Sequence, residues 1–228
     1  MNEKGRWNGL PLVIFGSGGI SREVAQLVED INCHSPVEMF DFMGFVESDP
    51  EMVGRESSIY DIVSCDKDFA GFAASFPVLG VVLPIGFPKV KRKIFSNVLA
   101  DIENLVFPNL IHPSVSVQRE TLDIGVGNII TAGVRLTTSI KIGNFNLFNL
   151  NSTVGHDVVI GDFCVINPVA TISGGVTIED DVLVGTGANV LQNITLKARS
   201  TVGAGALVSK EVPEDTTVVG IPAKPLAR

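Results

Sequence analysis

One histidine and its neighbours have the residue types that proton transfer needs. His156 follows Gly155 and precedes Asp157. Imidazole titrates near neutral pH, so His156 is able to accept a proton from an attacking amine or hydroxyl group. A nearby carboxylate holds the imidazole tautomer and stabilises the cation that forms, which makes Asp157 a candidate orienting residue. The alternative is a solvent-exposed histidine at a chain corner, and the spacing alone does not separate the two.

A glycine-rich segment, Gly16-Ser17-Gly18-Gly19, has the composition of a phosphate-binding turn. The apolar run Leu12–Phe15 precedes it, and apolar residues at helical spacing follow it. Backbone N–H groups and the helix dipole at such a turn bind phosphate. The full dinucleotide fingerprint requires glycine or alanine at position 21, where this chain has Ser21. The sequence therefore disfavours NAD as a ligand.

The first hundred residues alternate between strand and helix patterns, which would position such a turn. Strands are expected at 12–15, 40–46 and 78–83, and helices from about 20 to 31 and over 88–100. A strand, a glycine turn, a helix and a second strand open a parallel α/β unit. Glu47 ends the second expected strand.

From about residue 111 the apolar pattern has a period of six. Fifteen successive positions are large and apolar without a slip: Ile124, Ile130, Leu136, Ile142, Phe148, Val154, Ile160, Ile166, Ile172, Ile178, Val184, Val190, Leu196, Val202 and Val208. This period fits neither a helix nor a long strand, and it is typical of the hexapeptide parallel β-helix. Three hexads form a triangular coil, so residues 18 apart lie one above the other at about 4.8 Å. Ile111 and Val117 are one residue out of phase, which indicates an insertion near Leu122-Asp123.

With these motifs the chain resembles the bacterial sugar acetyltransferases that join a small Rossmann-like domain to a left-handed parallel β-helix. These enzymes N-acetylate nucleotide-linked 4-amino sugars, and relatives are sialic acid O-acetyltransferases. Besides the glycine turn, the resemblance rests on three stretches: Phe107-Pro108-Asn109-Leu110-Ile111-His112-Pro113-Ser114, Asn149-Leu150-Asn151-Ser152-Thr153-Val154-Gly155-His156-Asp157, and Val219-Gly220-Ile221-Pro222-Ala223-Lys224-Pro225. It implies a Rossmann-like nucleotide-sugar-binding domain over 1–108 and a left-handed β-helix acetyltransferase domain with a C-terminal tail over 109–228.

The resemblance also implies roles for single residues. His156 becomes the general base, and Gly174, one coil above it, donates its backbone N–H to the oxyanion formed from the acetyl-CoA thioester. Asn149 matches a family asparagine near the acceptor sugar, although a coil corner favours asparagine on conformational grounds alone. The turn Gly16–Gly19 and Glu47 fall where the family contacts the nucleotide.

The acyl donor implied by the resemblance is acetyl-CoA, bound along a groove between two prisms of a homotrimer. Its contacts map to Thr186 and Ala204, with Pro222 and Lys224 near the adenine and 3′-phosphate end. Residues 185–228 carry a net charge of +2, which suits a polyanionic cofactor. The charged residues there are Lys197, Arg199, Lys210, Glu211, Glu214, Asp215, Lys224 and Arg228.

These features predict an acetyl-CoA-dependent acetyltransferase that acts on a nucleotide-linked amino sugar in bacterial surface-glycan biosynthesis. Amino-sugar members often have histidine directly after the glycine turn, where this chain has Ile20. An O-acetyltransferase acting on sialic acid or another sugar therefore stays open, as does a β-helix binding protein without catalysis. A zinc-dependent carbonic anhydrase on the same scaffold would need three histidine ligands, and only His156 lies in the regular coils.

Composition sets the outer limits. The chain has 228 residues, a formal net charge of −8, 45% hydrophobic and 18% charged residues, which fits one large or two modest folded domains. The acidic balance argues against nucleic-acid binding, and no apolar run reaches the length of a membrane span. Three cysteines form neither a disulfide framework nor a zinc pattern, so we expect a cytoplasmic protein without a metal.

Overall fold

The structure, a computed structural model, describes residues 8–226, so Arg228 lies outside the described residues. The chain forms two compact units. One comprises the residues up to Ile85 together with Lys93–Pro113, and the other comprises Gly86–Arg92 and the residues from Ser114 onward. The sequence predicts one division, after residue 108. In the structure that division follows Pro113, and the short segment Gly86–Arg92 joins the second unit as well.

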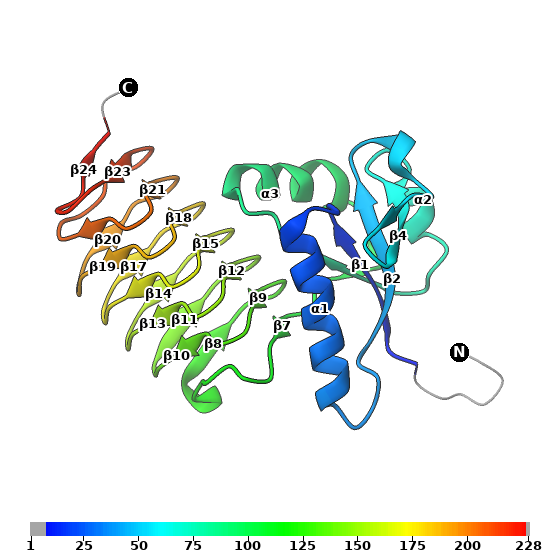
Figure 1. Cartoon of the computed structure of the whole chain (residues 1–228), viewed down its shortest axis with the longest axis horizontal. Helices are drawn as coiled ribbons and strands as arrows, with labels where there is room; N and C mark the ends of the chain where they lie inside the picture. The colour runs from blue at the N-terminus through cyan, green and yellow to red at the C-terminus, as the bar shows by residue number, and fades with distance from the viewer. Residues whose placement is uncertain (1–7, 227–228) are drawn as a thin grey trace. The chain divides into compact units, whose positions relative to one another are not determined.

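The first unit is built on a six-stranded sheet in the order β3-β4-β2-β1-β5-β6, parallel throughout except for β3 against β4. Its strands are β1 (Leu10–Phe15), β2 (Phe40–Glu47), β3 (Glu56–Ser57), β4 (Tyr60–Cys65), β5 (Leu79–Val82) and β6 (Leu105–Val106). Helix α1 (Gly19–His34) links β1 to β2, and α2 (Phe69–Ala73) lies between β4 and β5 in the chain (Figure 1). Since β2 and β5 flank β1 on opposite sides, the strand order reverses at β1. Open parallel sheets bind ligands outside the carboxyl ends of their strands at such a point.

Several elements in the first half of the chain differ from the expected ones. The helix expected over 88–100 is an α-helix, α3 (Pro88–Ile94), followed by a π-helix, Phe95–Leu99. Strand β4 and helix α2 have no counterpart among the expected elements. The polar residues of β4 break its apolar run, and α2 is too short to show a helical period. The remaining short elements are β7 (Leu110–Ile111) and the 3₁₀ helix Pro50–Met52.

The second unit is a parallel β-helix of two- and three-residue strands. Its sheets run β10-β13-β16-β19-β22, β20-β17-β14-β11-β8 and, within this unit, β24-β23-β21-β18-β15-β12-β9 (Figure 1). The strands are β8 (Leu122–Ile124), β9 (Ile129–Ile130), β10 (Arg135–Leu136), β11 (Ile140–Ile142), β12 (Leu147–Phe148), β13 (Thr153–Val154), β14 (Val159–Ile160), β15 (Val165–Ile166), β16 (Thr171–Ile172), β17 (Thr177–Ile178), β18 (Leu183–Val184), β19 (Asn189–Val190), β20 (Thr195–Leu196), β21 (Thr201–Val202), β22 (Leu207–Val208), β23 (Thr217–Val219) and β24 (Lys224–Pro225).

The six-residue period fixes both the core and the register of these coils. Of the fifteen apolar positions, all are buried except Ile124, which is half-buried. Partner residues in neighbouring strands are 18 positions apart, as Val154 is from Ile172. Residues in the left-handed conformation turn the corners, among them Asp157 and Asn193 with φ of 59° and 60°. The predicted stacking of residues 18 positions apart is thus confirmed.

The expected insertion is present slightly earlier than the sequence indicated. Ser116 bridges Arg135, 19 positions along the chain, whereas Leu122 pairs with Ile140 at the regular spacing of 18. The additional residue therefore lies before Leu122, where the 3₁₀ helix Arg119–Thr121 interrupts the strand pattern.

Two basic residues hold the start of α3 against the coils of the second unit. Lys91 is fully buried, and its Nζ donates a hydrogen bond to the carbonyl oxygen of Phe145 at 2.8 Å. The Nε of Arg92 lies 2.7 and 2.8 Å from the two carboxylate oxygens of Asp181. Its guanidinium group also lies 4.3 Å from the centre of the Phe163 ring. These contacts explain why Gly86–Arg92 belongs to the second unit.

Burial of Lys91 predicts a pH-dependent stability. Burial lowers the pKa of Lys91 to about 7, against the raising effects of Cys164 and Asp181. The unfolded chain holds this proton up to about pH 10.5, so between these two values the unfolded state binds more protons. The free energy of unfolding should therefore rise with pH across that window. Urea unfolding of the wild type at several pH values is expected to show this rise in the free energy of unfolding. Lys91→Met should abolish the rise. Lys89→Met, at an exposed position of the same helix, should retain it.

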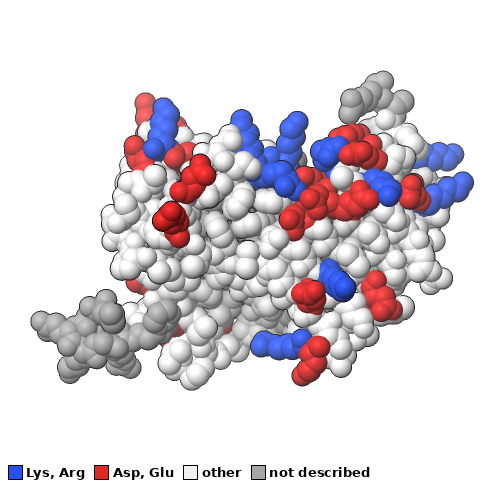
Figure 2. All heavy atoms as spheres, turned by 180° about the vertical axis from the view of Figure 1, so that it is seen from behind, with Lys and Arg blue, Asp and Glu red and all other residues white. Residues whose placement is uncertain are grey.

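Several charged side chains on the second unit are paired. Lys197 lies 3.1 Å from Glu179, and Arg199 contacts both Glu214 and Asp215. Acidic and basic groups accordingly lie side by side over this surface in Figure 2. Among the residues that the structure describes, no helix combines the length and the apolar character that crossing a bilayer requires.

Candidate active site

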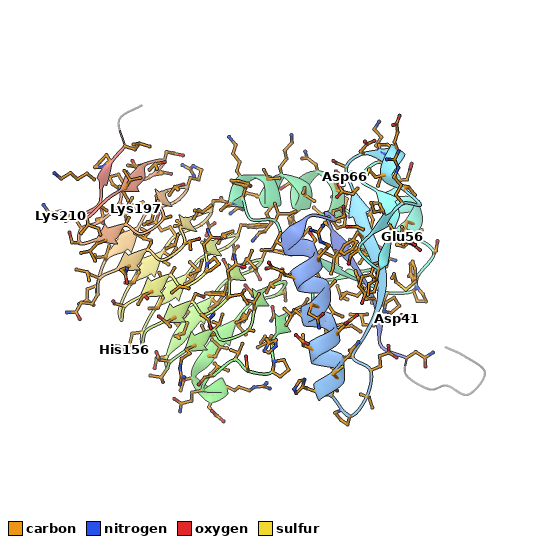
Figure 3. The ribbon with its side chains drawn as sticks, viewed as in Figure 1. Asp41, Glu56, Asp66, His156, Lys197 and Lys210 are labelled. Atoms are coloured by element: carbon orange, nitrogen blue, oxygen red, sulfur yellow. The ribbon has the colours of Figure 1, made fainter. Side chains whose placement is uncertain are left out.

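His156 lies at a corner of the second unit, between β13 and β14 (Figure 3). Its Nδ1 is 2.7 Å from Oδ2 of Asp157, so the carboxylate accepts the Nδ1 hydrogen and leaves Nε2 as the available base. The side chains are 67% and 66% exposed, which makes the ring accessible to a substrate. Asp157 turns the corner with a φ of 59°, a conformation that aspartate tolerates better than most residues. The structure thus brings the two residues together as the sequence predicts.

Gly174 lies directly over the imidazole, one coil further along the chain. The N–H of Gly175 donates to the carbonyl oxygen of His156 at 2.8 Å, which fixes the two coils in register. A Cβ atom at Gly174 would lie 2.5 Å from Nε2 and 2.6 Å from Cε1 of His156. Only glycine lets the ring occupy this place, because any side chain would overlap the imidazole.

The backbone N–H of Gly174 makes no hydrogen bond to any residue within 8–226. An unpaired donor beside an available imidazole nitrogen is the combination that acyl transfer uses, a base for the nucleophile and a donor for the oxyanion. The site therefore has the parts of a general-base acyltransferase within two consecutive coils.

The residues expected to contact the cofactor lie at a different corner. Thr186 falls between β18 and β19, and Ala204 between β21 and β22, both exposed. They stack one coil apart, since the N–H of Gly205 donates to the carbonyl oxygen of Thr186 at 2.8 Å. Pro222 and Lys224 are exposed further along the chain, with Lys224 in β24. One side of the triangular coil separates this corner from that of His156, so a single chain does not gather both sets.

Asn149 is buried rather than presented to solvent. It is 5% exposed, and its Nδ2 donates to Oδ1 of Asn167, one coil above, at 3.2 Å. Within one chain its amide thus links two consecutive coils, and its place near the acceptor sugar stays a prediction.

Solved structures resemble the whole chain, whereas no protein-family model and no curated protein matches it. A histidine-to-asparagine variant of perosamine N-acetyltransferase from Caulobacter crescentus, in complex with CoA and GDP-perosamine, is 25% identical with a TM-score of 0.85, covering 96% of this chain and 97% of its own. The acetyltransferase domain of PglB from Neisseria gonorrhoeae FA1090, in complex with acetyl coenzyme A, is 27% identical with a TM-score of 0.80, covering 96% and 100%. WeeI from Acinetobacter baumannii AYE is 30% identical with a TM-score of 0.80, covering 95% and 100%.

The chain belongs to the bacterial sugar acetyltransferase family. The expected family is confirmed, and with it the class of enzyme, an acyltransferase. Among residues 8–226 of this acetyltransferase, no group of three or more His, Cys, Asp or Glu side chains is placed to hold a metal ion.

Glu47 holds the glycine turn of this sugar acetyltransferase in place through hydrogen bonds. The N–H and the hydroxyl group of Ser17 both donate to Oε1 of Glu47, at 2.7 and 2.6 Å. Gly16 has a φ of 81°, which favours glycine, and a Cβ atom at Gly18 or Gly19 would meet no other atom within 4 Å. Helix α1 has neither a side-chain cap nor an acidic residue in its first turn. The start of α1 is therefore open to an anion, with one carboxylate at its edge.

Two residues near this turn were not predicted from the sequence. The Nη1 of Arg22 donates to the carbonyl oxygen of Ser17 at 3.2 Å, which places a cation beside the turn. Asp66 follows β4, and its N–H donates to the carbonyl oxygen of Glu47 at 3.0 Å. Burial, and then the charge of Glu47, raise the pKa of Asp66. Helical spacing alone could have found Arg22, one turn into α1, but Asp66 could not be placed without the unpredicted strand β4.

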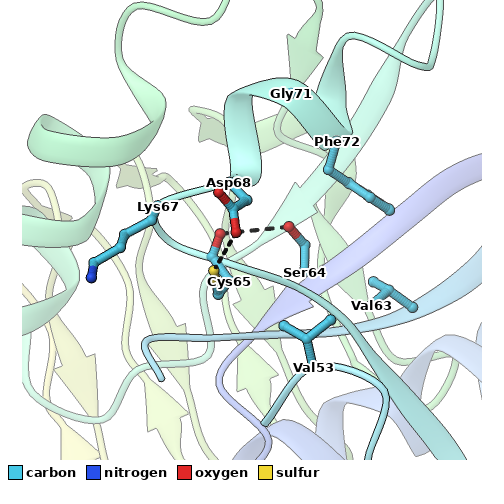
Figure 4. A pocket seen from close by; sticks show the side chains of 8 residues that line it. All are labelled: Val53, Val63, Ser64, Cys65, Lys67, Asp68, Gly71 and Phe72. Atoms are coloured by element: carbon cyan, nitrogen blue, oxygen red, sulfur yellow. Dashed lines mark hydrogen bonds between the residues drawn. The ribbon is translucent and has the colours of Figure 1, made fainter. Parts of the chain in front are cut away.

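A cavity of about 520 Å³ opens beside the end of β4 (Figure 4). Its apolar lining includes Val53, Val63 and Phe72, and its polar lining includes Lys67 and Asp68. The Sγ of Cys65 donates to Oδ2 of Asp68 at 3.3 Å, which holds that carboxylate in place. The cavity lies in the same unit as the glycine turn.

Proposed function

We propose that this acetyltransferase moves the acetyl group of acetyl-CoA to the amino group of a nucleotide-linked sugar, in the biosynthesis of bacterial surface glycans. The observation that carries the proposal is the His156 corner, where an available Nε2 lies next to Gly174, whose backbone N–H is unpaired within residues 8–226. The substrate classes are supported by the relatives, one in complex with CoA and GDP-perosamine and one with acetyl coenzyme A.

In the proposed reaction, the neutral amine of the sugar attacks the thioester carbon while Nε2 of His156 takes a proton from the nitrogen. The C–N bond forms, and the N–H of Gly174 donates to the oxyanion of the tetrahedral intermediate. The C–S bond then breaks, and the leaving thiolate of CoA receives the proton from His156. Asp157 holds the imidazole in the tautomer that this sequence needs and stabilises the imidazolium.

The first unit would hold the nucleotide end of the acceptor. We take it to be a Rossmann-like domain, because its parallel strand order reverses at β1 where the glycine turn begins. The diphosphate would lie against Gly18 and Gly19, and Glu47, fixed by Ser17, would accept hydrogen bonds from nucleotide hydroxyl groups. The second unit would be a left-handed β-helix, as in the family.

The residues matched to the cofactor and to the reacting carbonyl lie at two different corners of the coil, which favours an oligomer. The residues matched to the cofactor, Thr186 and Ala204, and the residue matched to the reacting carbonyl, Gly174, lie at opposite ends of one side of the coil. A six-residue side spans up to about 20 Å. A groove between the His156 corner of one copy and the Thr186 corner of another would supply both sets. We therefore propose a homotrimer with cyclic symmetry, whose sites are complete only between copies.

Ile20 is the reason to consider O-acetylation as a second reaction. It follows the glycine turn at a place where amino-sugar members often have histidine, so an O-acetyltransferase acting on sialic acid or another sugar is the alternative. A β-helix that binds without catalysis would have no use for the Asp157–His156–Gly174 arrangement. The cysteines Cys33, Cys65 and Cys164 are free thiols, which fits the proposed cytoplasmic location.

A thiol-release assay on size-separated protein tests the function and the assembly together. We expect free CoA to appear when acetyl-CoA is mixed with nucleotide-linked 4-amino sugars, in fractions whose light scattering gives three chain masses. Free sialic acid and the hydroxyl analogues of the same nucleotide sugars are the matched acceptors for the O-acetylation alternative. Thiol release with those alone would replace the amine as acceptor, and full activity in fractions of about 24 kDa would contradict the trimer.

A further inference from the structure

The carbonyl oxygen of Ser17, in the middle of the glycine turn, accepts hydrogen bonds from two side chains. One comes from the hydroxyl group of Ser57 at 2.9 Å, and the other from Nη1 of Arg22 at 3.2 Å. The N–H and the hydroxyl group of Ser17 both donate to Glu47. Every polar group of Ser17 thus has a partner. Since Ser57 lies 40 positions further along the chain, its bond fastens a distant segment to the turn.

Ser57 is held in place by the antiparallel hairpin of β3 and β4. It pairs with Tyr60 across a turn of two residues, Ser58–Ile59. The ring of Tyr60 packs against that of Phe42, with 4.7 Å between the ring centres, and its hydroxyl group donates to Glu29 of α1. The hydroxyl group of Ser57 therefore belongs to a packed element rather than to a free loop.

The peptide that joins Ser17 to Gly18 links this contact to the open side of the turn. A trans peptide is planar, so the C=O of Ser17 and the N–H of Gly18 point in opposite directions. Because Ser57 and Arg22 hold the oxygen, the N–H faces away from both donors. The N–H groups of Gly18 and Gly19 make no hydrogen bond within residues 8–226, and both glycines are exposed. The bond from Ser57 thus turns an unpaired donor toward the open start of α1.

The second donor makes the hydroxyl group of Ser57 dispensable for the fold. Without it, the carbonyl oxygen of Ser17 still accepts from Arg22, so no polar group loses its last partner. The pairing of β3 with β4 and the packing of Tyr60 do not use this hydroxyl group. Its removal should therefore loosen the orientation of one peptide and leave the stability of the unit nearly unchanged.

We propose that Ser57 is a positioning residue for the acceptor, which holds the peptide between Ser17 and Gly18 so that the N–H groups of the turn face the diphosphate of the nucleotide. The inference rests on the proposed function. Ser57 touches neither the substrate nor the reacting atoms. It sets the affinity for the nucleotide-linked acceptor and has no part in the transfer of the acetyl group.

Removal of this hydroxyl group tests the assignment, with calorimetric titration of UDP, GDP and CoA as the readout. In Ser57→Ala, the Kd for the diphosphate that the wild type binds and the KM for the nucleotide sugar should both rise about five-fold, the usual net worth of one hydrogen bond. The Kd for CoA and kcat should not change. Ser57→Thr keeps a hydroxyl group and should restore the affinity. Ser58→Asn is the matched control in the same turn, because asparagine tolerates the φ of 64° at this position.

The titrations separate the role of Ser57 from the proposed function. If Ser57→Ala binds the diphosphate as tightly as Ser58→Asn does, the role of Ser57 is wrong and the nucleotide site stands. An equal loss of CoA affinity also overturns it, because the substitution would then act on the whole fold. If the wild type binds neither UDP nor GDP, the nucleotide site at the turn and the role of Ser57 are both wrong, while thiol release still reports separately on acetyl transfer.

Discussion

In His156→Ala, kcat is expected to fall by about 10²- to 10⁴-fold, the usual worth of a positioned general base. The ring is largely exposed and carries no packing contact in the core, so the variant should fold and assemble normally. Acetyl-CoA affinity should change little, because the proposed cofactor contacts lie on later coils and at another corner. Steady-state kinetics with a nucleotide-linked amino sugar, together with a CoA titration, measure both quantities.

Asp157→Asn is the companion variant for this result. It keeps the size of the side chain and removes the carboxylate that accepts from Nδ1 at 2.7 Å. Its effect on kcat should therefore be smaller than that of His156→Ala, since the base remains but loses its orientation and charge partner. A wild-type kcat in His156→Ala, in protein of normal stability and mass, would mean that the residue is only an exposed corner histidine.

The β-helix and the corner proposed to be catalytic could be predicted because both depend on one period. A six-residue repeat with no slip fixes which residues stack, so Gly174 could be placed over His156 by counting 18 positions. The structure confirms this stacking, because the N–H of Gly175 donates to the carbonyl oxygen of His156. Counting failed only where the repeat is interrupted, at the 3₁₀ helix Arg119–Thr121.

The glycine turn, which is the proposed nucleotide site, was harder to predict from the sequence because its contacts join distant strands. Glu47 could be placed at the end of β2, but its two hydrogen bonds to Ser17 come from the pairing of β1 with β2. The position of Asp66 could not be predicted because it follows β4, and the polar residues of β4 interrupt the apolar pattern that would indicate a strand. The contact of Asn149 with the acceptor sugar stays a prediction, and within the chain its amide donates to Asn167.

Gly174→Ala is expected to lower kcat by about 10²-fold or more through the position of His156. The added Cβ would lie 2.5 Å from Nε2, closer than any real contact, so one of the two groups has to move. The imidazole is the end of an exposed side chain and can swing away at little cost, whereas the backbone of the coil is held on both sides by hydrogen bonds. The thermal midpoint should therefore stay within a few degrees of the wild type, while the base leaves its place beside the oxyanion donor.

A double-mutant cycle separates this route from an independent role of the glycine. If alanine acts by displacing the imidazole, the His156→Ala/Gly174→Ala enzyme should be no slower than His156→Ala alone, since there is no ring left to move. If the two losses multiply instead, the side chain at 174 blocks the thioester or its oxyanion directly. The expected result is strong non-additivity, because the only atoms that the structure places within 3.0 Å of the new Cβ are those of the His156 ring.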